Sequence, residues 1–118
     1  MLPPAHRMRR GADFTQTTRQ GTKVSRGRVV CYVYRPADEV GPGLAGLIVG
    51  KIVGNSVARH RASRRIRACL APVIRGLPEG TRVVVRALAG ADSDPGLCRD
   101  VTSAIHGALE RQSARQSG

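Results

Sequence analysis

The chain has 118 residues, and its 20 Lys and Arg residues against eight Asp and Glu residues give a formal net charge of +12. This length supports one domain with a single modest core, and a hydrophobic fraction of 41% excludes a wholly disordered chain. Such a charge attracts polyanions, and nucleic acid fits better than an anionic membrane, because no helix with a strong Trp, Phe and Leu face is apparent.

The N-terminal region predicts a cytoplasmic protein without a membrane partner. Residues 1–10 are basic but lack the apolar stretch of a signal peptide, and no run approaches the roughly 20 apolar residues of a membrane span. The three cysteines, Cys31, Cys69 and Cys98, are odd in number, fit no metal spacing and lie among apolar neighbours. We therefore expect them to be buried, reduced thiols.

The first half of the chain predicts a loose segment, a helix and two strands. Residues 1–10 form the loose basic N-terminus, since two consecutive prolines oppose helix there. Residues 13–20 are predicted as a short helix that a glycine ends. Residues 28–34 are rich in β-branched and aromatic side chains and predict a strand. Residues 44–49 predict a second strand, which is apolar on both faces and therefore central.

The second half predicts the remaining elements of a single domain over residues 1–118. A helix capped by Asn55 or Ser56 runs to about Ala71, where a proline ends or kinks it. A strand over 81–88 and a helix opened by Asp-Pro follow, and residues 112–118 form a flexible polar tail. This order predicts an α/β (α+β) sandwich of two layers, in which helices cover one sheet.

The helix that begins near residue 56 carries the main functional signal. At 100° per residue, its apolar side is core: Ala58, Ala62, Ile66, Cys69 and Leu70. His60 and several arginines lie opposite, with Arg65 at the margin and Arg59 entering the apolar side. No acidic residue lies between Glu39 and Glu79, so the repulsion among these charges is uncompensated. This favours a polyanion site over a merely solvated face.

The type of nucleic acid follows less directly from the residues. A face made almost entirely of arginine suits backbone phosphates rather than base edges. Phe14, Tyr32 and Tyr34 are the only aromatic residues, and they could stack on unpaired RNA bases or simply fill the core. Among the three histidines only His106 has an acidic residue three or four positions away, Glu110, and no metal-ligand spacing occurs, so we expect neither a catalytic residue nor a metal site in this chain.

Residues 51–67, "KIVGNSVARHRASRRIR", resemble the signature helix of the bacterial ribonuclease P protein subunit. The positions that match its pattern are Lys51, Gly54, Asn55, Val57, Arg59, Arg61, Arg64 and Arg67. "RMRRGADF", "QGTKV" and "GLIVGK" are similar to the family's neighbouring segments and occur in the same order. Two positions depart from the pattern, since His60 replaces an asparagine and Ser63 replaces a lysine.

The resemblance implies a ribosomal-protein-S5-domain-2-like fold: a mixed sheet of about four strands with a left-handed βαβ crossover that carries the arginine-rich helix. From pattern alone a right-handed crossover would be expected. The resemblance also implies an accessory subunit that assists removal of the 5′ leader from precursor tRNA. Its partners would be the catalytic RNA subunit and precursor tRNA, with no obligate protein partner. The RNA, with Mg²⁺, would carry the chemistry, and the protein alone would be inactive.

The resemblance assigns two groups of binding residues. The group that would face the RNA subunit is Lys51, Asn55, Arg59, His60, Arg61, Arg64 and Arg67, together with Arg65, which is not part of the family's pattern but can restore the charge lost at Ser63. The group that would contact the single-stranded leader is Phe14, Tyr32, Arg9 and Arg10, while Thr18 stands where the family often has an aromatic residue. Two alternatives remain open from the residues: a ribosomal-type RNA-binding protein that only stabilises folded RNA, and a DNA-binding regulator that is a dimer.

Overall fold

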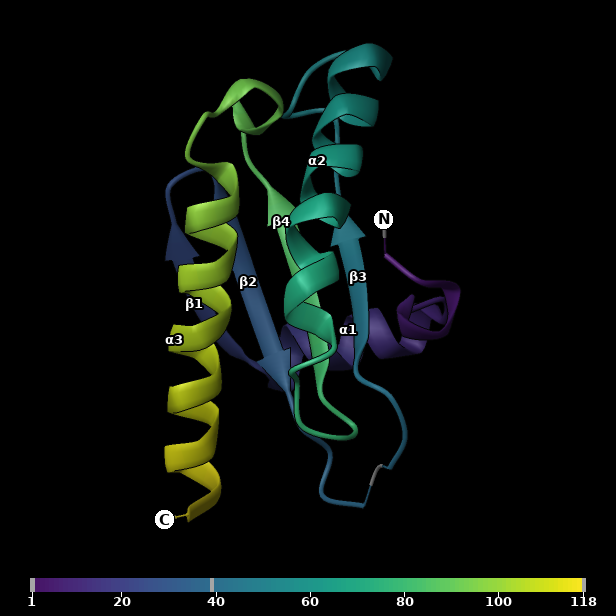
Figure 1. The fold of residues 1–118 in the computed structure, drawn as a ribbon, viewed down its shortest axis with the longest axis vertical. Coiled ribbons are helices and arrows are strands. Elements are labelled where there is room, and N and C mark those ends of the chain that lie inside the picture. The colour runs from purple at the N-terminus through teal and green to yellow at the C-terminus, as the bar shows by residue number, and fades with distance from the viewer. Residues whose placement is uncertain (1, 39, 118) are drawn as a thin grey trace.

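The computed structural model describes residues 2–38 and 40–117. Its elements are η1 (Pro4–His6), α1 (Gly11–Gln20), β1 (Thr22–Arg26), β2 (Val29–Tyr34), β3 (Leu44–Ile48), α2 (Ser56–Ile74), β4 (Arg82–Ala87), η2 (Ala91–Ser93) and α3 (Leu97–Ser117). The four strands form one mixed sheet in the order β1-β2-β4-β3. Only the pair β3 and β4 is parallel. Helices α2 and α3 cover one face of the sheet, and α1 lies across the other (Figure 1).

The connection from β3 through α2 to β4 is left-handed. In Figure 1 both strands point upward, α2 lies in front of the sheet, and the chain moves from β3 on the right to β4 on the left. The α+β fold and the crossover implied by the resemblance are therefore confirmed. The general preference for right-handed crossovers does not hold for this chain.

The two sides of β2 contribute to two separate apolar clusters, as the strand's period of two predicts. Val29, Cys31 and Val33 belong to the larger cluster, between the sheet and helices α2 and α3. Val30 and Tyr32 belong to the smaller cluster on the α1 side. The sheet is thus buried on both faces, and each face lies under a different candidate RNA-binding region.

The N-terminal segment is not loose, and that prediction is wrong. Leu2 is only 2% exposed and Met8 is also buried. The Met8 amide donates a hydrogen bond of 2.8 Å to the carbonyl of Ala45, and Arg7 forms a parallel bridge with the same residue. The edge strand β3 has unpaired backbone groups on its outer side, and the N-terminal segment satisfies part of them.

The C-terminal region also differs from the prediction. Helix α3 continues to Ser117 instead of giving way to a tail at residue 112. Gln112 is buried, and its Oε1 accepts a hydrogen bond of 2.8 Å from the Thr22 hydroxyl in β1. This contact between distant residues gives the last turns of α3 a partner that their polar composition does not reveal. Residue 118 lies outside the described residues.

The expectation of three reduced thiols is wrong for two of them. Cys69 in α2 and Cys98 in α3 form a disulfide, with a Cα–Cα distance of 5.0 Å. Cys31 is free and fully buried in β2, where burial raises the pKa of its thiol to about 12. The disulfide links the arginine-rich helix covalently to its neighbour on the same face of the sheet.

Candidate RNA interface

Helix α2 presents the basic face that its periodicity predicts. Ala62, Ile66 and Leu70 are buried against the sheet and α3, whereas the side chains of His60, Arg61 and Arg64 are exposed. The apolar residues recur every three to four positions, so the charged residues between them are left on the outer side. This arrangement confirms the predicted division of the helix into a core side and a basic side.

The start of α2 is fixed by local interactions. Gly54 has a φ of +143°, a conformation that L side chains rarely adopt, which explains glycine at this position of the motif. The Asn55 side chain accepts a hydrogen bond of 2.9 Å from the Ala58 amide and so caps the helix. Asn55 therefore has a structural role, although its side-chain amide remains exposed together with Lys51.

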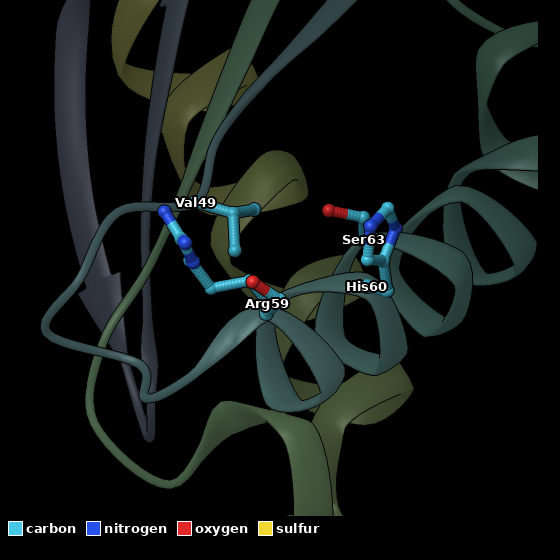
Figure 2. Close-up of a pocket in the computed structure, with 5 residues that line it drawn as sticks. Val49, Arg59, His60 and Ser63 are labelled. Carbon is cyan, nitrogen blue, oxygen red and sulfur yellow. The ribbon is translucent and has the colours of Figure 1, made fainter.

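A hollow of about 220 Å³ lies beside the first turns of α2 and is lined by Val49, Ser56, Arg59, His60 and Ser63. Figure 2 shows Arg59 reaching toward Val49, with His60 and Ser63 on the other side of the hollow. The Nε of Arg59 is buried and, within the described part of the chain, has no hydrogen-bond acceptor. A cationic donor beside a helix N-terminus is suited to an anion such as a phosphate. His60 and Ser63, the two residues that depart from the family's pattern, both line this hollow.

Two arginines of α2 interact with the turn that precedes α3. Arg65 donates hydrogen bonds to the backbone carbonyls of Asp92 at 3.0 Å and Asp94 at 2.7 Å. Arg65 therefore holds this turn against α2, a structural role that the sequence did not predict. Arg61 lies 3.5 Å from the Asp92 carboxylate, but half of its side chain is exposed, so this ion pair contributes little and leaves the guanidinium accessible to RNA.

The opposite side of the sheet contains the residues predicted to contact the leader. Arg9 and Arg10 are exposed and line a hollow of about 390 Å³ together with residues of α1. Phe14 is partly buried, and its ring packs so closely on Gly46 that a Cβ there would lie 2.4 Å from it. Glycine in β3 is therefore required for the position of this ring.

Tyr32 offers little surface for stacking. It is only 6% exposed within the smaller cluster, and the Arg86 guanidinium lies 6.0 Å from its ring centroid. The core-filling interpretation, which the sequence left open, therefore describes Tyr32 better than stacking does. The sequence pattern did not single out Arg86, although the alternation of β4 places it on the same face as Val84.

The described residues contain neither a metal-binding cluster nor a membrane span. No group of three or more His, Cys, Asp and Glu side chains among them is arranged to hold a metal ion. Likewise, none of the helices in residues 2–38 and 40–117 has the length and apolar character needed to cross a bilayer. The ionisable groups that do converge are mainly cationic and line the hollows on the two sides of the sheet.

A sequence model described as Ribonuclease P matches residues 2–109 of the chain. The chain belongs to the ribonuclease P protein family. The "Ribonuclease P protein component" of Kocuria rhizophila is 42% identical over 94% of this chain and 98% of its own length. That of Mycolicibacterium gilvum is 43% identical over 98% of this chain and 92% of its own length.

Solved structures of the family have the same fold. The ribonuclease P protein of Staphylococcus aureus superimposes with a TM-score of 0.68 at 23% identity, covering 90% of this chain and 94% of its own. The ribonuclease P protein of Thermotoga maritima superimposes with a TM-score of 0.56 at 16% identity, covering 88% of this chain and 94% of its own. Family and fold together confirm the main function predicted from the sequence, that of a ribonuclease P protein subunit in the processing of tRNA 5′ ends.

Proposed function

We propose that the chain binds the catalytic RNA subunit of ribonuclease P through the basic face of α2 and the 5′ leader of precursor tRNA through the α1 side of the sheet. The observation that carries this proposal is the placement of cationic side chains on both sides of one small sheet. A protein with two such surfaces can bridge two polyanions that otherwise repel each other. Its contribution is binding and orientation of the substrate in the cytoplasm.

The chemistry is assigned to the RNA subunit. Mg²⁺ prefers carboxylate and phosphate oxygens, whereas the charged side chains that line the two hollows are mostly arginines. These residues do not fit a Mg²⁺ site, so the metal is proposed to be held by RNA phosphates. The protein alone is accordingly proposed to be inactive as a nuclease. Family membership favours this function over a ribosomal-type RNA-binding protein and over a DNA-binding regulator.

The proposal is tested by measuring binding of the RNA subunit across a series of salt concentrations. Arg61→Ala removes an exposed guanidinium from α2 and should weaken binding by about 1–3 kcal/mol. The slope of log K against log salt should become flatter by about 0.7 to 0.9 for one lost phosphate contact. Arg111→Ala, an exposed arginine of α3, is the matched control. Unchanged affinity together with an unchanged slope for Arg61→Ala would mean that this face does not contact RNA.

A further inference from the structure

The two candidate RNA surfaces meet at one residue that the sequence did not single out. Arg7 lines three adjacent hollows. The first is shared with Arg64 and Arg67 of α2, the second with Phe14 and Arg67, and the third with Arg9 and Arg10. The N-terminal segment that carries Arg7 runs along the β3 edge, between α2 in front of the sheet and α1 behind it (Figure 1). Arg7 thus occupies the junction between the proposed RNA-subunit surface and the proposed leader surface.

The position of Arg7 is fixed by its surroundings. Its backbone is held in the bridge to Ala45, and the buried side chain of Leu2 anchors the start of the segment. The Nε of Arg7 donates a hydrogen bond of 3.1 Å to the carbonyl of Leu2. The side chain is partly buried and already oriented, so less conformational entropy is lost when its terminal nitrogens bind a ligand.

Arg7, Arg64 and Arg67, called here the junction triad, enclose a hollow of about 240 Å³ with Ala68. The two ion pairs found among the described side chains are Arg61–Asp92 and Arg82–Asp13, and neither involves the triad. The three arginines line this hollow together, and like charges on neighbouring side chains repel one another unless an anion lies near them. A tetrahedral phosphate matches them, because each planar guanidinium can donate two hydrogen bonds to its oxygens.

We propose that the junction triad binds one backbone phosphate of RNA where the RNA subunit and the leader approach each other, and that Arg7 is an RNA-binding residue of this protein. The inference rests on the proposed function, since it takes RNA as the ligand. The phosphate can come from the RNA subunit or from the leader. These sources share their chemistry and differ in the binding assay that detects them.

The test is a double-mutant cycle with Arg7→Ala, Arg64→Ala and the double variant, each checked for folding by thermal denaturation. One assay measures affinity for the RNA subunit, and a second measures affinity of the assembled complex for precursor tRNA and for mature tRNA. The binding affinity of each single variant should fall roughly tenfold or more, and both variants should show this fall in the same assay. The fold-loss of affinity in the double variant should be clearly smaller than the product of the two single fold-losses, because both residues contact one phosphate. Arg75→Ala, an exposed arginine at the end of α2, is the control.

The outcomes show whether the phosphate comes from the RNA subunit or from the leader. They also distinguish failure of the junction triad from failure of the proposed function. Loss in the RNA-subunit assay assigns the phosphate to that RNA, and loss for precursor tRNA alone assigns it to the leader. Multiplicative losses or no loss would each overturn the shared phosphate, and so would equal losses for precursor and mature tRNA without a loss in the RNA-subunit assay. If Arg61→Ala weakens binding while the triad variants do not, the proposed function stands and this inference fails. If the wild-type protein does not bind the RNA subunit, the proposed function itself fails.

Discussion

The carboxylate of Asp13 in α1 forms an ion pair with the guanidinium of Arg82 in β4, although the two residues are 69 positions apart in the chain. Both side chains are largely buried, with exposed fractions of 19% and 10%. Arg82 lies at the start of a central strand, and Asp13 lies in the first turn of the helix that carries Phe14. This ion pair therefore anchors the helix of the proposed leader surface to the sheet.

Removal of this carboxylate should destabilise the protein. Asp13→Ala removes the carboxylate that pairs with the largely buried Arg82 guanidinium, and the free energy of unfolding should fall by about 3 kcal/mol. Urea denaturation followed by circular dichroism measures this change. Asp38→Ala, which removes an exposed loop carboxylate, serves as the control and should change little. Equal stability of the two variants would show that the ion pair does not stabilise the fold.

The disulfide between Cys69 and Cys98 should stabilise the fold only under oxidising conditions. Cys98→Ser removes the cross-link between α2 and α3 and should lower the free energy of unfolding by about 2–4 kcal/mol. In excess dithiothreitol, the wild-type protein and the variant should unfold at nearly the same denaturant concentration. A difference that persists after complete reduction would indicate that the thiol itself stabilises the fold by packing. The comparison shows how the stability of the fold differs between oxidising and reducing conditions.

Cys31 should make the stability depend on pH in the alkaline range. Its folded-state pKa of about 12 lies above the ordinary value of 9.0, because burial disfavours the thiolate. The unfolded chain therefore loses this proton first, and the stabilising contribution is complete below pH 9 and is lost as the pH rises toward 12. Wild type should lose about 1.4 kcal/mol per pH unit more than Cys31→Ala in this range. Parallel pH profiles for the two proteins would contradict a buried neutral thiol.

The partly exposed ring of Phe14 should distinguish precursor from mature tRNA. If this ring stacks on a leader base, Phe14→Ala weakens precursor binding by the assembled complex by about 1–3 kcal/mol. Binding of mature tRNA, which has no leader, should stay the same. Tyr32→Ala should behave differently, because Tyr32 is a core residue whose truncation destabilises the fold and weakens binding of both RNAs. Equal losses for both RNAs with Phe14→Ala would assign Phe14 to the core as well.

Local patterns in the sequence were sufficient to predict the elements that carry the basic face. The alternation of β2 and the spacing of Ala62, Ile66 and Leu70 in α2 are properties of neighbouring residues, and the structure confirms both. The side on which His60 and Arg64 lie follows from the same spacing. These predictions succeeded because burial in one helix or strand imposes its period directly on the sequence.

The features that the sequence did not reveal depend on contacts between distant residues. Arg7 and Leu2 looked like part of a loose basic end, because only the folded sheet provides the β3 edge on which they lie. The pairing of Cys69 with Cys98 depends on how closely α2 and α3 approach. Arg65 matched the basic pattern of its helix, yet its donors are directed to the turn before α3. Position in the folded chain, rather than residue type, decided each of these roles.

In the proposed function, this protein binds and orients the substrate while the RNA subunit supplies the chemistry. The most direct measurement is cleavage of precursor tRNA across a Mg²⁺ titration with protein alone, RNA subunit alone, and both together. A chain with a net charge of +12 should offset the repulsion between the two RNAs. We predict no cleavage by protein alone, cleavage by RNA alone only at high Mg²⁺, and cleavage by the mixture at much lower Mg²⁺. Metal-dependent cleavage at the mature 5′ end by protein freed of RNA would contradict this division of roles.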